Sequence, residues 1–422
     1  MPFDTALQAE VQAILTRRRW WIAALLFFAG LINYFDRTIV SVALPAIASD
    51  LHLDPERMGI LLSAFFWSYA AMQIPIGWLS DRCNLRWLYA GCFALWSVTC
   101  GLTGFASSLL ALVLLRVLLG IGESVYLPGG MKLVSMLFPP EDRGLASGLS
   151  NCGTRAGLAF GAPLIASVVA AFGWKHAFFI LGFTSVAWIV PWILSFPRGA
   201  NTVALAAHAP RSPRWGHIDR NLLGIGLTNI GYGYYFYLLM TWLPTYLVQT
   251  RHLPLALAGT YAAIPYLTFT LSEPIGGWIA DRLVILGWEE IFARKVLITA
   301  AFSTSVLLIP AGLVADTRSA VALLGGACLV GLSTGNLYAL VQRVSAGGDV
   351  GFSIGFFNLA GNIPGIAAPI VTGFIVGRMH SYVPAFAVAV AILLAVLPIH
   401  WRMIQPQRAP RLILADRSES DR

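Results

Sequence analysis

The sequence predicts an all-α polytopic membrane protein with twelve transmembrane helices, arranged as two six-helix bundles related by a pseudo-twofold axis. Composition, the number of long apolar stretches and an internal duplication support this fold class. Of the 422 residues, 57% are hydrophobic and only 11% are charged, whereas a soluble domain carries about 25% charged residues. The mean hydropathy is +0.72. The alternating strands of an outer-membrane barrel are not evident in the sequence.

Apolar stretches long enough to cross a bilayer as a helix of about 20 residues recur along the whole chain. They are expected at roughly 20–45, 57–80, 86–106, 109–137, 142–172, 176–196, 221–249, 256–282, 294–314, 318–344, 350–378 and 382–404. The chain is therefore divided into a cytoplasmic N-terminal segment (1–19), an N-terminal bundle (20–196), a cytoplasmic linker (197–220), a C-terminal bundle (221–404) and a cytoplasmic tail (405–422).

Two sequence motifs recur in the second half of the chain. Gly-Trp-Leu-Ser-Asp-Arg at 77–82 returns as Gly-Trp-Ile-Ala-Asp-Arg at 277–282, and the segment 144–151 is echoed by 351–358. Halves repeated in parallel orientation are typical of transporters that hold a substrate between two bundles near the membrane midplane.

The net charge of +8 reflects membrane topology and not a nucleic-acid site. Most Lys and Arg residues lie in the termini and in the loops on the same side of the membrane as the termini, as the positive-inside rule predicts for cytoplasmic segments. We therefore expect both termini in the cytoplasm of a cell whose plasma membrane, the inner membrane of a bacterium, holds the protein. The basic triplet 17–19 precedes an apolar run too long for a signal peptide.

Four charged residues interrupt predicted membrane helices: Asp36 and Arg37 in the first, Arg116 and Glu123 in the fourth. A charge at mid-bilayer costs at least ~2.5–3.5 kcal/mol, so such residues usually handle an ion, a proton or a charged substrate. The alternative is a buried ion pair that only holds two helices together.

Arg116 and Glu123 lie seven residues apart and so share one helix face. Arginine keeps its charge and can hold a carboxylate through two parallel hydrogen bonds, whereas glutamate can gain or lose a proton. The combination is sufficient to couple the binding of an anion to the binding of a proton.

Several segments resemble the major facilitator superfamily, and more closely its anion:cation symporters, which include hexuronate, galactonate and phthalate transporters and sialin. The segments are Asn-Tyr-Phe-Asp-Arg at 33–37, 77–82, 116–123, 138–144, 173–174 and 241–247. The resemblance implies that Asp36 and Glu123 take part in proton coupling and that Tyr34, Arg37, Tyr69 and Arg116 lie at or near the substrate site. It also implies that the repeated motif controls the cytoplasmic gate through Gly77, Asp81, Arg82, Gly277, Asp281 and Arg282.

Arg155, in the fifth predicted helix, departs from the resembled family, whose sugar-acid transporters tend to be uncharged near this position. Two interpretations are open: it binds an acidic group of the substrate, or it pairs internally with Glu123 or Asp36. Other polar residues either line the cavity or pack helices together, and those predicted as substrate contacts are Asn229, Tyr232, Tyr338, Asn358 and Asn362.

We expect a proton-coupled symporter that takes up a small organic anion, such as a sugar acid or a mono- or dicarboxylate, by alternating access. Proton-antiport efflux and a non-transporting membrane sensor of an organic acid are the alternatives. An enzyme is not expected, because no catalytic nucleophile, metal cluster or phosphate-binding loop is recognisable. We expect a monomer in the lipid bilayer with no cofactor or metal other than protons and no nucleic-acid partner.

Overall fold

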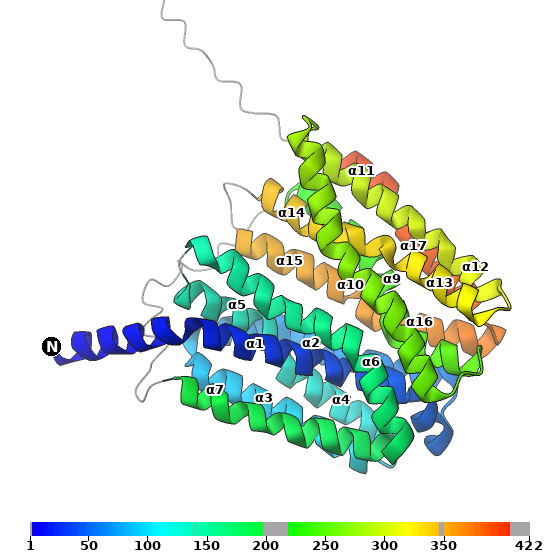
Figure 1. The fold of residues 1–422 in the computed structure, drawn as a ribbon, viewed down its shortest axis with the longest axis horizontal. Helices are drawn as coiled ribbons and strands as arrows, with labels where there is room; N and C mark the ends of the chain where they lie inside the picture. The colour runs from blue at the N-terminus through cyan, green and yellow to red at the C-terminus, as the bar shows by residue number, and fades with distance from the viewer. Residues whose placement is uncertain (1, 139, 197–217, 346–349, 406–422) are drawn as a thin grey trace, which may run out of the picture.

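The computed structural model describes residues 2–138, 140–196, 218–345 and 350–405, and in these ranges every regular element is a helix (Figure 1). The N-terminal half contains α1 (Pro2–Leu51), α2 (Pro55–Arg82), α3 (Leu85–Leu102), α4 (Leu109–Glu123), α5 (Tyr126–Leu137), α6 (Pro140–Ser185) and α7 (Ile189–Ser195). The C-terminal half contains α9 (Arg220–Gln249), α10 (Leu255–Ile285), α11 (Glu290–Ser303), α12 (Leu308–Leu313), α13 (Thr317–Ala327), α14 (Thr334–Val344), α15 (Val350–Asn362), α16 (Pro364–Met379), α17 (Val383–Ala395) and α18 (Leu397–Met403). Short 3₁₀ turns, including η4 (Cys328–Ser333), join several of them.

The described helices form twelve membrane crossings, as predicted. Ten stretches are long and apolar enough to span a bilayer, and one of these, Gly148–Ser195, contains two crossings. Gly173, with φ 79° and ψ 163°, breaks α6 there, because glycine adopts this backbone conformation without the steric cost of a side chain. The 30-residue helix α9 supplies the remaining crossing. Helix α1 extends back to Pro2, so most of the predicted N-terminal segment continues the first helix.

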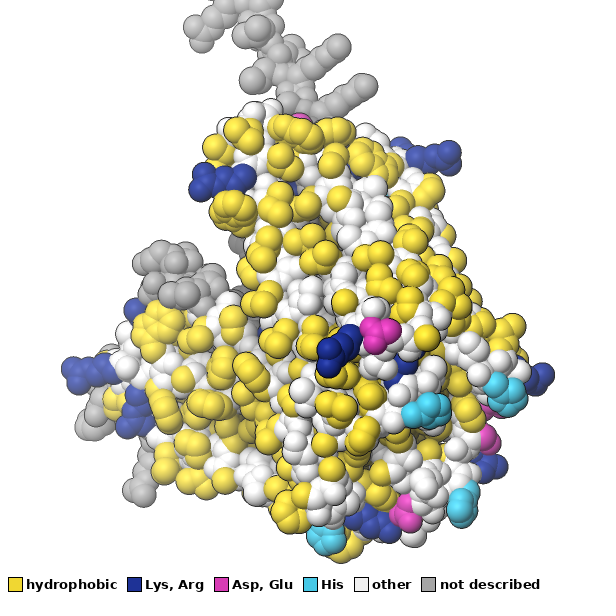
Figure 2. Space-filling model, turned by 45° about the vertical axis from the view of Figure 1, so that its right-hand side comes forward, with side chains coloured by type: hydrophobic (Ala, Val, Ile, Leu, Met, Phe, Trp, Pro, Cys, Tyr) yellow, Lys and Arg dark blue, Asp and Glu magenta, His cyan; other side chains and the backbone are white. Residues whose placement is uncertain are grey.

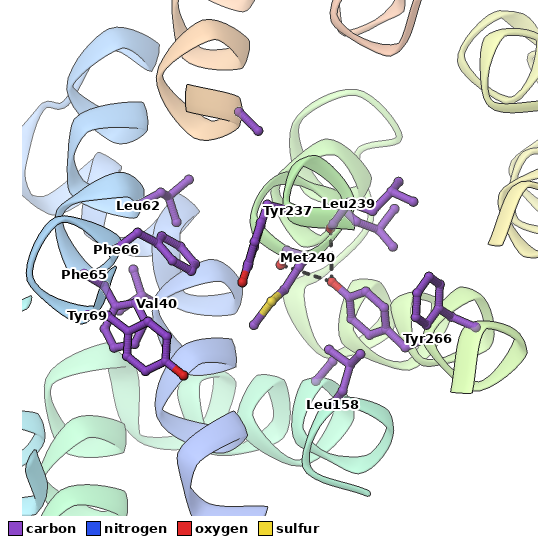
Figure 3. Close-up of a cluster of buried hydrophobic side chains, with 14 of the residues drawn as sticks. Val40, Leu62, Phe65, Phe66, Tyr69, Leu158, Tyr237, Leu239, Met240 and Tyr266 are labelled. Atoms are coloured by element: carbon purple, nitrogen blue, oxygen red, sulfur yellow. Dashed lines mark hydrogen bonds between the residues drawn. The ribbon is translucent and has the colours of Figure 1, made fainter. Parts of the chain in front are cut away.

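The two bundles meet mainly through three helix pairs among the described elements: α6 with α10, α2 with α16, and α1 with α9. The first two pairs are equivalent under the pseudo-twofold axis, because the 77–82 motif ends α2 and its repeat lies in α10. Aromatic side chains also cross the boundary. The ring centres of Phe66 on α2 and Tyr237 on α9 lie 4.6 Å apart across it (Figure 3). Within the C-terminal bundle, Tyr266 on α10 donates a hydrogen bond toward the carbonyls of Leu239 and Met240 on α9.

The membrane side opposite the termini, called here the far side, is closed. Chain alternation places the start of α10 at this side, where a Cβ on Gly259 would lie 2.3 Å from the Ala166 Cβ of α6. On the side that carries the termini, no atom lies within 4 Å of a Cβ built on Gly77, Gly277 or Gly355. The bundles therefore pack tightly at the far side and leave more space toward the termini.

Apolar side chains cover much of the face seen in Figure 2, as expected where lipid replaces water. Exposed Phe, Leu and Ile side chains occur along α2, α4, α6 and α10, for example Ile74, Leu110, Phe160 and Leu271. The interior holds apolar side chains together with buried serine, threonine, asparagine and charged side chains. This distribution agrees with the predicted polytopic membrane protein.

The far-side packing gives a first prediction. In Gly259→Ala, the added methyl group overpacks the α6–α10 contact at a cost of ~1–3 kcal/mol, which lowers the ratio of the closed to the open state by about 5- to 150-fold. Spin labels at the far ends of α6 and α10 should then show a longer distance distribution. Gly355→Ala, which meets open space, is the matched control and should leave the distribution unchanged. Identical distributions in the two variants would contradict the tight contact.

Candidate functional site: a buried charge cluster beside a central recess

The predicted charges of the first and fourth crossings do come together, inside the N-terminal bundle. Glu123, at the end of α4, is fully buried, and its Oε2 accepts hydrogen bonds from Arg37 Nε at 3.1 Å and from Asn33 Nδ2 at 2.8 Å. Its other oxygen, Oε1, accepts no hydrogen bond from a described residue. Glu123 is thus an ion-pair partner of Arg37 with one oxygen that no described hydrogen bond engages.

Asp36 and Arg116 form the second part of this cluster. The Cys100 thiol donates a hydrogen bond to Asp36 Oδ1 at 3.1 Å, and Arg116 Nη1 donates to the backbone carbonyl of Asp36 at 3.3 Å. Asp36 is 1% exposed and Arg116 is 3% exposed. Two acids and two bases therefore lie together away from solvent, and their formal charges cancel when all four are ionised.

Aromatic rings surround the Arg37 guanidinium. Its central carbon lies 5.3 Å from the ring centre of Tyr34, 4.7 Å from that of Phe65 and 4.5 Å from that of Tyr69. Arg116 lies 5.0 Å from the same Phe65 ring. Cation–π attraction is stronger where water is excluded, so these rings help to hold both cations in the membrane interior. Figure 3 shows Phe65 and Tyr69 beside the boundary between the bundles.

A polar recess lies between the bundles, with an empty volume of about 560 Å³ that includes space open to the surroundings. Tyr34 and Arg155 line it from the N-terminal bundle. The C-terminal bundle supplies Asn229, Tyr232, Gly233, Phe236, Tyr237, Thr334, Leu337, Tyr338, Phe357, Asn358, Gly361 and Asn362. Its walls thus combine aromatic rings and side-chain amides with one guanidinium among the described lining residues, a composition suited to an organic anion.

Hydrogen bonds fix several recess side chains. Tyr237 donates to Asn362 Oδ1 at 2.8 Å, Tyr338 donates to Asn358 Oδ1 at 3.2 Å, and the Tyr232 hydroxyl pairs with that of Thr334 at 2.8 Å. These bonds orient the phenols and amides before any ligand binds, which lowers the entropic cost of binding.

Asn229 is fixed in the same way, because it donates to the Phe357 carbonyl at 2.8 Å. The five polar residues predicted from the second half of the chain therefore line the recess, and their contact with substrate remains a prediction.

Arg155 on α6 forms an ion pair with Glu273 on α10, with 2.7 Å between Nη2 and Oε2. Its orientation follows from the α1–α6 contact. A Cβ on Gly157 would lie 2.6 Å from the Leu31 carbonyl oxygen, so that face of α6 touches α1. Arg155 is two positions away, about 200° around the helix, and so points toward the C-terminal bundle. The proposed internal partners, Glu123 and Asp36, are not the ones that it contacts.

Three of the predicted substrate contacts, Arg37, Tyr69 and Arg116, do not belong to the recess lining. Arg37 lies directly behind Tyr34, which does line it, whereas Arg116 lies on the Asp36 side of Phe65. The structure thus separates the predicted site into a recess and a charge cluster, with the Tyr34–Arg37 contact between them.

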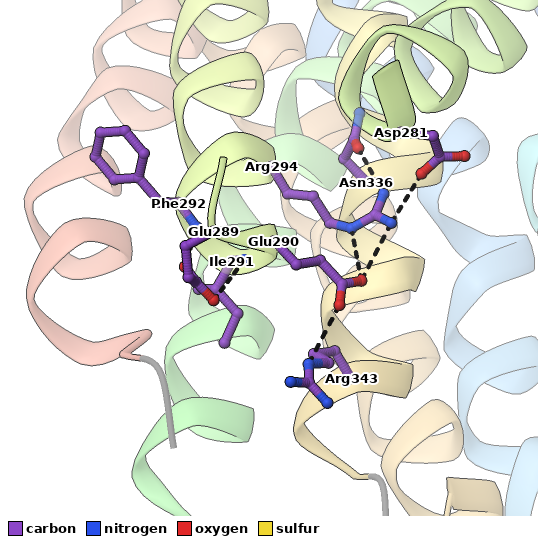
Figure 4. A network of polar contacts seen from close by, with 8 residues as sticks. All are labelled: Asp281, Glu289, Glu290, Ile291, Phe292, Arg294, Asn336 and Arg343. Atoms are coloured by element: carbon purple, nitrogen blue, oxygen red, sulfur yellow. Dashed lines mark hydrogen bonds and ion pairs between the residues drawn. The ribbon is translucent and has the colours of Figure 1, made fainter. Parts of the chain in front are cut away.

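The repeated motif lies at the terminus side of α2 and α10. Asp281 accepts a hydrogen bond from Arg294 at 3.0 Å, and Arg294 also contacts Glu290 and Asn336, while Arg343 contacts Glu290 (Figure 4).

Equivalent arginines of the repeats stack on tryptophans, Arg82 on Trp78 and Arg282 on Trp278. The side chain of Asp81 lies outside the described part of the structure. The gating role of these residues stays a prediction.

Sequence reasoning did not assign Glu273, Asn33 or Cys100 to the site. Glu273 carried a usable signal, since a carboxylate within an apolar helix requires a partner. Asn33 was visible within the 33–37 motif, one helical turn before Arg37. Cys100 gave no signal, because a cysteine in a membrane helix usually packs as a small apolar residue.

Residues 26–342 match the family model of the Major Facilitator Superfamily, so this chain belongs to that superfamily of membrane transporters. It is 32% identical over 377 residues to the hexuronate transporter of Bacillus subtilis (strain 168), which covers 86% of this chain and 89% of that protein. It is 31% identical over 417 residues to a probable galactarate/D-glucarate transporter of Escherichia coli (strain K12), covering 90% and 92% of the two chains.

The fold is also similar to a crystal structure of a bacterial homologue of the human lysosomal transporter Spinster. The TM-score is 0.76 and the sequence identity 17%, with 91% of this chain and 96% of that chain covered. The predicted fold and superfamily are thereby confirmed.

The charge cluster gives a second prediction. Arg116→Gln should leave the cluster with one uncompensated negative charge, which costs ~3–5 kcal/mol when a buried partner is removed. The melting temperature of the purified protein in detergent should fall clearly. Adding Asp36→Asn to the same variant should restore much of the loss, because the cluster is again neutral. A double variant as unstable as Arg116→Gln would show that Arg116 stabilises the protein by packing alone.

Proposed function

We propose that this protein is a proton-coupled symporter that takes up a small organic anion across the plasma membrane by alternating access. The observation that carries the proposal is the position of Arg37. This residue is paired with Glu123 on one side and lies against Tyr34, a wall of the recess, on the other. One cation is thereby shared between a carboxylate that can take a proton and a cavity that can take an anion.

The coupling follows from competition for Arg37. A proton on Glu123 cancels the charge that holds Arg37, so the guanidinium becomes available to a substrate anion at the recess. An anion that binds first favours protonation of Glu123, because Arg37 no longer compensates it fully. Asp36, with its carboxylate next to Cys100, is the second proposed proton site. Neither proton nor anion then needs to cross as an isolated charge.

Arg155 is the proposed anion contact within the recess. Among the described residues that line the recess, Arg155 carries the guanidinium group. The surrounding side-chain amides can form hydrogen bonds with hydroxyl or carbonyl groups of a substrate. Relatives named as hexuronate and galactarate/D-glucarate transporters favour a sugar acid as the substrate class. Arg116 is proposed as a further anion contact only in another state of the cycle, since here it faces Asp36.

The distribution of basic residues supports cytoplasmic termini, so the proposed orientation makes the less tightly packed side of the two bundles the cytoplasmic one. We propose that the structure represents an inward-facing state and that a single chain performs the cycle. Efflux by proton antiport would use the same cluster, and the direction of proton-driven accumulation distinguishes the two.

The proton-coupling role predicts the behaviour of Glu123→Gln, which removes the titrating group and keeps the side-chain shape. In proteoliposomes with an imposed pH gradient, accumulation of labelled D-glucuronate or D-glucarate should be lost. Exchange of the same acid across the membrane without a gradient should persist, because binding and bundle movement remain. Gradient-driven accumulation at the wild-type level would refute the role of Glu123.

The anion-binding role predicts the behaviour of Arg155→Lys. Lysine keeps the positive charge but loses the planar fork that holds a carboxylate, so the Kd for the transported acid should rise about tenfold, equivalent to ~1.4 kcal/mol. Arg343→Lys is the matched control, because Arg343 pairs with Glu290 outside the recess. Isothermal titration of both purified variants makes the comparison. If Arg155→Lys and Arg343→Lys bind the acid with equal affinity, Arg155 does not contact the substrate.

A further inference from the structure

The ion pair between Arg155 and Glu273 crosses the boundary between the bundles. Its two side chains are each 24% exposed, and Glu273 is the ion-pair partner that the structure gives Arg155 among the described residues. Arg155 lines the recess, whereas Glu273 lies outside the lining set. Glu273 therefore lies beside the recess and neutralises Arg155, the cation that would bind an anion there.

Holding α6 against α10 does not require this pair. The two helices already meet at the far side, where Gly259 packs against Ala162 and Ala166. Apolar residues of similar volume often stabilise a protein as well as, or better than, a buried ion pair. A function in the transport cycle accounts for a charged pair at this position better than helix packing does.

We propose that the substrate carboxylate displaces Glu273 from Arg155 and that the displaced Glu273 carboxylate takes up a proton, which makes Glu273 a further proton-carrying site. This inference rests on the proposed function, in which Arg155 binds the anion. Two carboxylates that share one guanidinium in the membrane interior leave an excess negative charge, which is costly there. One proton, entering from the aqueous side, converts the Glu273 carboxylate to the neutral acid and removes that excess.

Among the described residues, the groups around Glu273 do not provide another counter-ion. The ionisable groups that interact with it are Arg155 from α6, Tyr232 from α9 and Tyr338 from α14. On α11, Arg294 is engaged with Asp281 and Glu290, and Lys295 donates to the carbonyls of Trp401 and Ile404. Other ionisable groups on the described parts of the elements packed against α10 include Cys152, Lys175 and His176 of α6, Arg220 of α9, Glu289 of the α11 N-cap, Arg318 of α13, Cys328 of η4 and Arg343 of α14. None of these is paired with Glu273 among the described contacts.

The consequence is measurable in the proton balance. In the wild-type protein, each bound anion should bring one proton for Glu273 in addition to those taken up by the charge cluster. The equivalent position in the N-terminal bundle, 200 residues earlier, is Gln73, which cannot titrate. The additional proton is therefore a property of α10 and not of the repeat.

The test uses the full-length protein in detergent with D-glucuronate, D-glucarate and phthalate as probes. Glu273→Gln removes the competing charge and keeps a hydrogen-bond acceptor for Arg155. The Kd of the Glu273→Gln variant for the acid that the wild type binds should be about tenfold lower than the wild-type Kd. The slope of log Kd against pH should correspond to one fewer proton taken up on binding than in the wild type.

Glu56→Gln is the matched control. Glu56 on α2 and Arg378 on α16 form another ion pair between the bundles, at 3.8 Å, but this pair is exposed at the far side. Like Glu273→Gln, this variant removes an ion pair between the bundles. Unlike Glu273→Gln, it leaves Arg155 paired. Its Kd and pH dependence should match those of the wild type.

The outcomes separate the inference from the proposed function. If Arg155→Gln loses binding but Glu273→Gln binds like the wild type with an unchanged pH dependence, Glu273 is a structural partner and the inference is wrong. An affinity change of equal size in Glu56→Gln would also overturn it. If Arg155→Gln binds like the wild type, or if the wild type binds none of the three acids, the proposed anion site fails and the inference fails with it.

Discussion

The cost of placing a charge in the membrane interior governs the arrangement of this protein. Several charged side chains that the described structure holds away from water have partners: Glu123 pairs with Arg37, Arg155 pairs with Glu273, and Arg116 donates to the backbone carbonyl of Asp36. Isolated charges at this depth cost several kcal/mol, whereas compensated groups cost less. A substrate anion or a proton that enters this region would meet a resident partner, and the coupling proposed above consists of exchange with that partner.

The packing of the bundles gives this exchange a mechanical setting. Small residues close the far side, where Gly259 and Ala166 bring α10 against α6, and the space on the terminus side of the repeated motif is larger. The recess lies between the bundles with most of its wall supplied by the C-terminal one. The buried charge cluster belongs to the N-terminal bundle, and Tyr34 lies between its Arg37 and the recess.

Much of this could be predicted from the sequence because the signals are local. A hydrophobic run of sufficient length specifies a membrane helix whatever surrounds it, and the repeated Gly-Trp motif reveals the duplication directly. The break between the fifth and sixth crossings falls at Gly173, between the predicted spans 142–172 and 176–196. The charges of α1 and α4 were recognisable as a functional group because each interrupts an apolar helix.

The sequence by itself thus determined the number of crossings, the two-bundle plan and the residue types of the site. Only the tertiary structure decided which charges are partners. Arg155 pairs with Glu273 in the other bundle and not with Glu123 or Asp36, and Asp36 accepts a hydrogen bond from Cys100. The physical reason is that helical periodicity determines the face on which a side chain lies, whereas the helix opposite that face depends on how all twelve crossings pack together.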